Sequence, residues 1–292
     1  MKKRFLLPVI FMLVIAAHSQ NKASSGTATP SPYEPDILKA FADSLYNEGF
    51  LSQAEGEYKR FLFSPGVKSE DSNYQSSLLV LTNIYKKQNS TNGIEWLKQG
   101  FYDKAEIPVK EKINFTQAGF VFKTRSASDF LLFTNSFEPD KNNFSSTFTD
   151  LINTSTLVLN KDIEGLKNQC AILSASNPDY EPLNTLSLKY KTKSPGLALF
   201  LSTILPGCGK WYTGSFGAFT SSFLTIGSFV AGTVLTGIQT EWKSWQPYVF
   251  GSCGLVLYIA ELYGSYQSAK RYNAAAFRTL CEETDKLYEK EY

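Results

Sequence analysis

Few residues of this sequence have the chemical type and the spacing that catalysis or metal binding needs. The only histidine, His18, lies in an N-terminal segment typical of a cleaved leader. Without it, the chain has no imidazole to act as a general base, triad member or metal ligand. The four cysteines, Cys170, Cys208, Cys253 and Cys281, are far apart and form no C-x-x-C pair, so no zinc site is expected. Many enzyme mechanisms are thereby excluded.

Pairs of carboxylates could still serve as a general acid and a general base, for example in a glycan hydrolase. Paired acids occur at Glu70-Asp71 and Glu282-Glu283. Adjacent residues on a helix do not face one another across a substrate, so we interpret both pairs as solvated charge. The sequence predicts a protein that is not an enzyme, with no catalytic residue, no metal, no cofactor and no small-molecule substrate.

A glycine-rich segment is the remaining candidate for ligand chemistry. A phosphate-binding P-loop requires G-x-x-x-x-G-K-[ST], but here Trp211 follows Lys210, and Ile204 occupies the place of the leading glycine. Glycine permits unusual backbone dihedrals and proline ends a helix. We therefore expect a tight re-entrant or interfacial turn, with the motif residues Pro206, Gly207, Gly209, Tyr212 and Gly214.

Glu261 is the one acid inside a long apolar stretch. A carboxylate in a membrane is unfavourable and suggests a functional site by default. Three interpretations remain open: structural pairing with Lys210 on the preceding turn, ion or proton handling, and exposure at the membrane interface. Pairing is the interpretation that we favour.

The elements that carry these residues are apolar helices. Residues 195–268 contain four charged residues, and residues 217–238 form a stretch of 22 without any. A second long stretch covers residues 247–267, after a tryptophan-containing turn at 239–246. Stretches of this length predict membrane spans, and aromatic residues near their ends favour the interface. Small residues leave room for close pairing of the two helices, so we predict a transmembrane helical hairpin.

The number of crossings depends on the first apolar run, Leu197–Leu205. A third crossing would place Lys270, Arg271 and Arg278 in the cytoplasm, as the positive-inside tendency favours. The run offers only about 15 Å of helix before Pro206, half of the hydrocarbon thickness. We therefore expect two spans and a re-entrant first segment.

The N-terminus predicts export. Residues 1–19 have the form of a signal peptide, with three leading cations, an apolar run of thirteen residues and small residues before Gln20. An uncleaved anchor is the alternative. Residues 20–35 form a polar linker. The net charge is +2, or −1 without the three leading cations, so no nucleic-acid partner is expected.

Residues 36–176 show helical spacing of apolar residues. The first unit resembles a tetratricopeptide (TPR) repeat: Ala42 and Ala54 match its small packing positions, Gly49 its turn and Tyr58 its bulky position. Later units are more degenerate, and an irregular helical bundle is the alternative. The fold prediction is all-α: a TPR-like stack of helical hairpins, followed by the transmembrane hairpin. Such stacks usually present a concave surface to a protein partner.

The remaining segments are a connector and a C-terminal helix. Residues 177–194 contain two prolines and several lysines near their end. We interpret this segment as a solvated linker, as a flank that contacts lipid headgroups, or as both. Residues 269–292 are predicted to form an amphipathic helix that leaves the membrane module of residues 195–268 and either returns onto the repeats or contacts a partner.

Residues 192–275 resemble a module of uncharacterised bacterial membrane proteins, in which a signal peptide and TPR-like repeats often precede the module. The resemblance lies in Lys193-Ser194-Pro195, Leu201-Ser202, the turn motif, Tyr263-Gly264, Ser268-Ala269 and Asn273-Ala274. It implies membrane residence and no reaction. We expect a non-enzymatic protein of the bacterial inner membrane, with its repeat domain on the periplasmic side as an adapter for a protein partner. The alternative is a membrane subunit of a transport or envelope-biogenesis complex.

Overall fold

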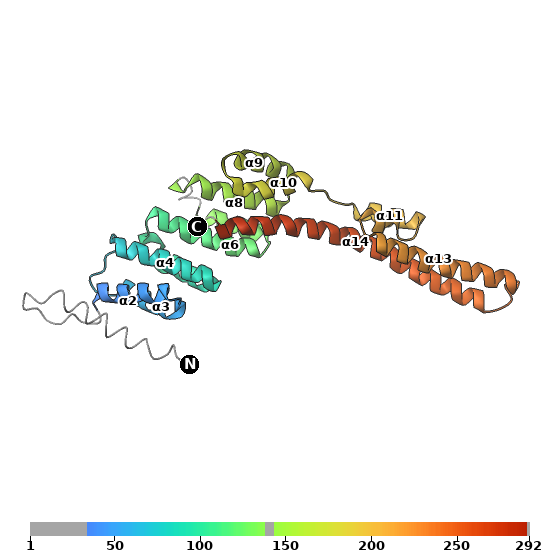
Figure 1. The fold of residues 1–292 in the computed structure, drawn as a ribbon, viewed down its shortest axis with the longest axis horizontal. Helices are drawn as coiled ribbons and strands as arrows, with labels where there is room; N and C mark the ends of the chain where they lie inside the picture. The colour runs from blue at the N-terminus through green and yellow to red at the C-terminus, as the bar shows by residue number, and fades with distance from the viewer. Residues whose placement is uncertain (1–33, 138–142, 291–292) are drawn as a thin grey trace, which may run out of the picture. The chain divides into compact units, whose positions relative to one another are not determined.

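The computed structural model describes residues 34–137 and 143–290, and every element within these ranges is a helix. The predicted all-α class is confirmed. The predicted signal peptide (1–19) and all of the linker (20–35) except its last two residues lie outside the described ranges. The chain separates into two units, one ending at Ile113 and the other beginning at Asn114. This division falls inside the predicted repeat domain, and Figure 1 labels the helices of both units.

Unit 1 is built from helical hairpins. Helices α2 (Pro35–Asn47) and α3 (Leu51–Leu62) form the first hairpin, and α4 (Ser72–Gln88) and α5 (Thr91–Gly100) follow. A short 3-10 helix, η1 (Tyr102–Lys104), precedes α6 (Ile107–Lys123), in which the boundary between the units lies.

The residues predicted to pack the first hairpin lie in its interior. Ala42, Ala54 and Tyr58 are fully buried, and Gly49 adopts φ +84°, which turns the chain between α2 and α3. The Tyr58 hydroxyl donates to Asp43 Oδ1 at 2.5 Å. Burial, and then this contact with a carboxylate, raise the pKa of Tyr58. The hairpin is therefore observed, whereas a regular TPR stack over residues 36–176 stays a prediction.

Unit 2 contains a second group of short helices. They are α7 (Ala127–Ser136), α8 (Ser146–Asn160), α9 (Ile163–Ser176), the 3-10 helix η3 (Pro178–Tyr180) and α10 (Glu181–Lys189). Local signals set their ends: the Ser145 and Asp162 side chains cap α8 and α9, and Lys161 (φ 57°) makes the left-handed turn between them.

A single helix of 45 residues, α14 (Gln246–Lys290), joins this group to the apolar module. The predicted boundary at residues 268/269 is not a break, since the helix continues through it. Towards its C-terminus, Leu280, Cys281, Leu287 and Tyr288 enter the same core as Phe122 and the helices α7–α10. Tyr288 also shares a hydrogen bond of 2.8 Å with Ser155. The C-terminal helix therefore completes the core of unit 2.

The apolar module consists of α11 (Pro195–Ile204), α12 (Cys208–Tyr212), α13 (Phe216–Gln239) and the first half of α14. Helix α13 pairs with α14 as a hairpin, and α11 and α12 pack against α14 near the open end. In the described part of the chain, α13 is the one helix that is long and apolar enough to cross a membrane. The second predicted span, 247–267, contains Glu261 and several tyrosines and is less apolar.

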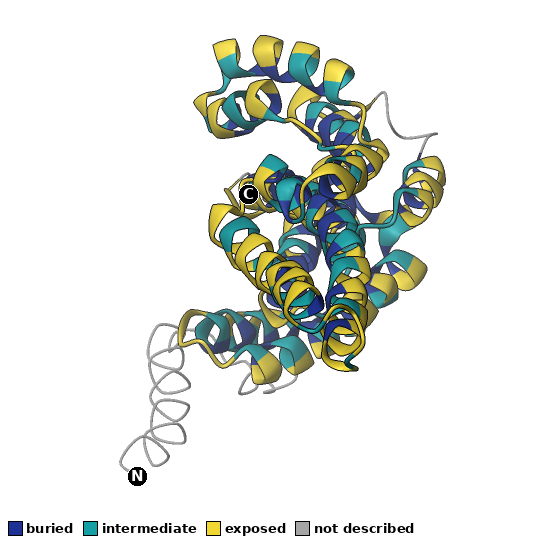
Figure 2. Cartoon of the chain, turned by 90° about the vertical axis from the view of Figure 1, so that its right-hand side faces the viewer, coloured by how far each residue is buried: buried dark blue, intermediate teal, exposed yellow. Residues whose placement is uncertain are grey.

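Exposure differs between the two ends of unit 2. Among the described residues, 22 of the 30 exposed large hydrophobic side chains lie between Leu197 and Tyr263. In Figure 2, the exposed faces appear in yellow and the buried inner faces in dark blue. The module thus turns an apolar surface outwards, whereas the C-terminal half of α14 buries its apolar residues.

Candidate functional site

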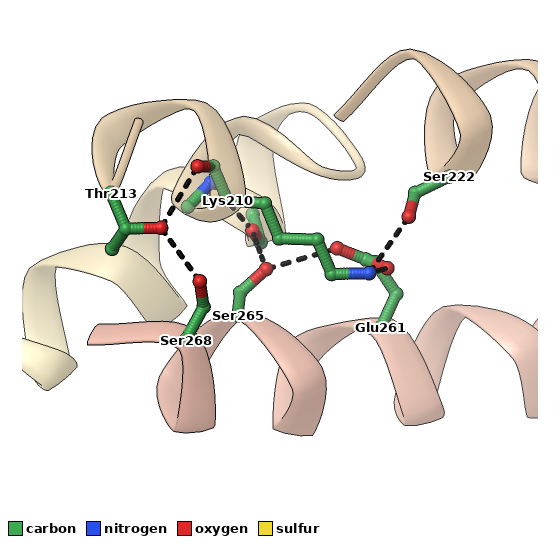
Figure 3. Close-up of polar contacts among 8 residues, drawn as sticks. Lys210, Thr213, Ser222, Glu261, Ser265 and Ser268 are labelled. Carbon is green, nitrogen blue, oxygen red and sulfur yellow. Dashed lines mark hydrogen bonds and ion pairs between the residues drawn. The ribbon is translucent and has the colours of Figure 1, made fainter. Parts of the chain in front are cut away.

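The turn motif and Glu261, the acid of the second apolar stretch, meet at one place in the module. Four elements bring polar side chains together there: α11 contributes Ser202, α12 Lys210, α13 Ser222 and α14 Glu261. Figure 3 shows Lys210 lying along α14 with its ammonium group beside Glu261. Residues that the sequence separates by 51 positions are thus in direct contact.

The centre of this site is an ion pair. Lys210 Nζ lies 2.5 Å from Glu261 Oε2 and also donates to Ser222 Oγ at 2.9 Å. The side chain of Glu261 is 5% exposed and that of Lys210 is 21% exposed. Burial of a carboxylate is unfavourable unless a cation pairs with it and donors hydrogen-bond to it, and the geometry supplies both.

A chain of hydroxyl groups reaches the second oxygen of the carboxylate. The amide N–H of Gly209 donates to Ser202 Oγ (2.9 Å), Ser202 donates to Ser265 Oγ (2.7 Å), and Ser265 donates to Glu261 Oε1 (3.0 Å). Both serines are fully buried, and each accepts one hydrogen bond and donates one. Bonds aligned in one direction polarise one another and strengthen the network.

A second, smaller link lies one turn along α14. The Thr213 hydroxyl donates to the carbonyl oxygen of Lys210 at 2.8 Å, and Thr213 and Ser268 are 2.7 Å apart. Because a hydroxyl has one proton, Ser268 is the donor in the second bond. This link fixes the end of α12 on α14.

Two glycines of the motif are required by the close contacts of the helices. A Cβ on Gly209 would collide with the carbonyl oxygen of Ala198 and lie 2.7 Å from Ser265 Cβ. Gly207 adopts φ +89°, and a Cβ there would lie 2.9 Å from the carbonyl oxygen of Phe219. Any larger residue at Gly209 would separate the helices on which the hydroxyl chain depends.

The two ends of the module are held together. The main-chain N–H of Lys193 donates to Asn273 Oδ1 at 2.7 Å, and Asn273 Nδ2 donates back to the Lys193 carbonyl at 2.9 Å. Tyr212 accepts a bond from the Ser194 N–H at 3.3 Å, and its ring lies 4.6 Å from Lys193 Nζ. The connector therefore enters the module where α14 leaves it.

Glu261 pairs with Lys210, as expected from the sequence, but the serines around this pair were not predicted. Ser265 and Ser268 follow Glu261 at four and seven positions, which places all three on one face of a helix. A polar stripe inside an apolar stretch was the available signal. Serine is also common in membrane helices as a small residue, which hides the stripe. Pro206 ends the apolar run before the turn, and Gly214 (φ +89°) closes it.

Comparison of the chain with protein-family models, with curated proteins and with solved structures gives no match.

Proposed function

We propose that the chain is a membrane-anchored adapter, in which residues 195–268 form the anchor and the helical hairpins of residues 36–176 bind a protein partner. The observation that carries the anchor is the exposed apolar surface between Leu197 and Tyr263. Exposed patches of more than a few hundred Å² are rare on soluble monomers and mark interaction with lipid or protein. The length and composition of α13 support a lipid contact.

The pairing of the module's ends supports two crossings. Lys193 and Asn273 are hydrogen-bonded and therefore lie at the same depth, which requires an even number of crossings between them. Helix α11 has 10 residues, about 15 Å at 1.5 Å per residue, and is too short to cross. It lies against α14 as a re-entrant or interfacial segment.

Aromatic residues support the same placement. Tyr248 and Tyr266 on α14 are separated by about 27 Å of helix, close to the roughly 30 Å of a hydrocarbon core. Trp242 and Trp245 lie in the turn beyond Tyr248, with exposed side chains. Amphipathic rings prefer the interface, so the two groups mark the two sides of the bilayer.

The network around Glu261 favours a structural role over transport. Both carboxylate oxygens and the Lys210 ammonium bond to side chains of the module. In the described part of the chain, the buried side-chain atoms that lack a hydrogen-bond partner all lie outside residues 195–268. A network paired in this way holds α11, α12, α13 and α14 together.

The location that we propose is the bacterial inner membrane, with the helical domain on the periplasmic side, as the N-terminal segment predicts. The charge distribution opposes this orientation. Lys270 and Arg271 are exposed at the end where α14 leaves the module, whereas the turn at the other end contains the pair Glu241–Lys243. The positive-inside tendency is a bias that short hairpins can violate, so orientation must be measured.

Site-specific photo-crosslinking of the full chain tests the adapter proposal. A photoreactive amino acid is placed at Phe63 or Leu132, each 70% exposed on the helical hairpins, and for comparison at Leu235 or Leu255, each 59% exposed on the apolar module. A discrete protein adduct at Phe63 or Leu132, kept when the lipid-facing residues are exchanged for other apolar residues, supports the adapter. Adducts to a membrane protein at Leu235 or Leu255 alone would support the transport or biogenesis subunit.

A further inference from the structure

We propose that five cations at the open end of the module bind the headgroups of anionic phospholipids. These residues, here called the cationic collar, are Lys189, Lys191, Lys193, Lys270 and Arg271. The inference rests on the membrane residence proposed above, and it adds a ligand class and the residues that contact it.

The fold brings the two halves of the collar together. Lys193 is hydrogen-bonded to Asn273 through its main chain, which places the connector beside residues 270–273 of α14. Helix α10, which ends at Lys189, also packs against α14. Lys270 lies one helical turn after Tyr266, at the end of the apolar stretch. Lys193, Lys270 and Arg271 therefore lie where the apolar surface ends, and Lys189 and Lys191 precede them at the end of α10 and on the connector.

The charge of the collar is not neutralised by the protein. No acid occurs between residues 182 and 240 or between residues 262 and 281. Lys189, Lys191, Lys270 and Arg271 are exposed, and no ion pair joins them to a carboxylate within residues 34–137 and 143–290. By contrast, Lys286 pairs with Glu283 and Lys290 with Asp179, farther along α14.

Aromatic rings hold two of the ammonium groups at the interface. Lys193 Nζ lies 4.6 Å from the Tyr212 ring centroid, and Lys270 Nζ lies 4.6 Å from that of Tyr266. Tyrosine rings prefer the depth of the lipid headgroups, so these contacts keep the cations where lipid phosphates lie. A soluble polyanion would not require cations at the edge of an apolar surface. The position of the cations at that edge therefore favours a lipid as the ligand.

The experiment measures lipid selectivity of the full chain. The protein is reconstituted in phosphatidylcholine vesicles that contain trace spin-labelled phosphatidylglycerol or spin-labelled phosphatidylcholine. Electron paramagnetic resonance then gives the fraction of each labelled lipid held at the protein. We expect phosphatidylglycerol to be preferred about two- to fivefold at low salt, and the preference to fall as salt is added.

Two variants with the same change in net charge separate the collar from general electrostatics. In the collar variant, Lys189, Lys191, Lys270 and Arg271 are each replaced by Gln, and the preference should fall to about one. In the control variant, Lys123, Arg278, Lys286 and Lys290 are replaced by Gln, and the preference should remain. Equal loss in both variants, or none in the collar variant, would overturn the proposal.

Three further outcomes show whether the phosphate belongs to a lipid and which of the two proposals fails. If inorganic phosphate abolishes the preference while chloride of equal ionic strength does not, the site binds free phosphate and the lipid proposal is wrong. If the chain inserts and shows no preference, the collar proposal alone fails. If the chain does not float with the vesicles, both the collar proposal and the membrane anchor are refuted.

Discussion

Replacing Lys210 with methionine should destabilise the module by about 3 kcal/mol. The change leaves the Glu261 carboxylate, 5% exposed, with Ser265 as its remaining donor. Removing one partner of a buried ion pair costs about 3–5 kcal/mol. The partial exposure of Lys210 places the estimate at the lower end.

A double-mutant cycle isolates the pair. Glu261→Gln keeps an acceptor for Ser265, and the double variant Lys210→Met/Glu261→Gln removes both charges together. We expect the double variant to lose about 1 kcal/mol, so that the coupling energy is at least about 2 kcal/mol. The assay is the unfolding of the full chain in mixed detergent micelles with increasing sodium dodecyl sulfate, followed by circular dichroism and tryptophan fluorescence.

The exposed pair Glu241–Lys243 is the matched control, because its side chains are 74% and 79% exposed at a similar distance of 2.5 Å. Lys243→Met should change stability by less than about 0.5 kcal/mol. Additive losses in the cycle at Lys210 and Glu261 would refute the structural role of the buried pair. Equal effects at Lys210 and Lys243 would contradict the argument from burial.

Three further predictions concern packing, pH and thiols. Gly209→Ala should destabilise the module by about 1–3 kcal/mol in the same assay. The control Gly227→Ala should be neutral or stabilising, because the space around its added Cβ is open. Equal effects of the two substitutions would contradict the close contact of α11, α12 and α14. Burial, and then Lys86, lower the pKa of Lys112 to about 8, so the unfolded chain binds more protons than the folded chain between about pH 8 and 10.5. The free energy of unfolding should therefore rise with pH in that window. Urea denaturation should show this rise, and the Lys112→Met variant should show a smaller one. Burial raises the pKa of Cys170 to about 12 and that of Cys281 to about 11. Both thiols should therefore resist maleimide at pH 7.5 in the folded chain and react after unfolding. Modification of both thiols in the folded chain would show that the core of unit 2 opens.

The sequence predicts the local elements of the module well. The charge-free stretch 217–238 corresponds to α13 (Phe216–Gln239). This prediction is robust because mean hydropathy over such a stretch depends on many residues at once. The turn after Ile204 was also predictable, since Pro206 and Gly207 interrupt the helix by mechanisms local to the backbone.

The continuity of α14 was not predicted, whereas the packing of its C-terminal part on helices of residues 36–176 was one of the two expected outcomes. Residues 270–273 are polar and mark the end of the apolar stretch, yet no glycine or proline follows Gly264 to end the helix. Leu280, Thr284 and Leu287 share a buried face, which the spacing indicates. That this face completes the core around Phe122 depends on tertiary packing that a single sequence does not encode locally.

The core of unit 2 depends on α14. A fragment of residues 36–176 lacks the α14 residues that fill the core of unit 2, so its failure to fold would say little about the repeats. Likewise, the polar network around Glu261 draws side chains from four helices, and spacing along the sequence identifies only those on α14.

The most direct test of the anchored hairpin is the accessibility of two engineered cysteines in a background that lacks the native ones. Ser244→Cys lies in the turn between α13 and α14, and Glu289→Cys lies near the end of α14. Cells permeabilised at the outer membrane alone are treated with a membrane-impermeant maleimide. We predict labelling at position 289, and at position 244 only after the inner membrane is breached. Equal labelling at both positions would contradict the crossing, and labelling at position 244 alone would contradict the exported two-span arrangement.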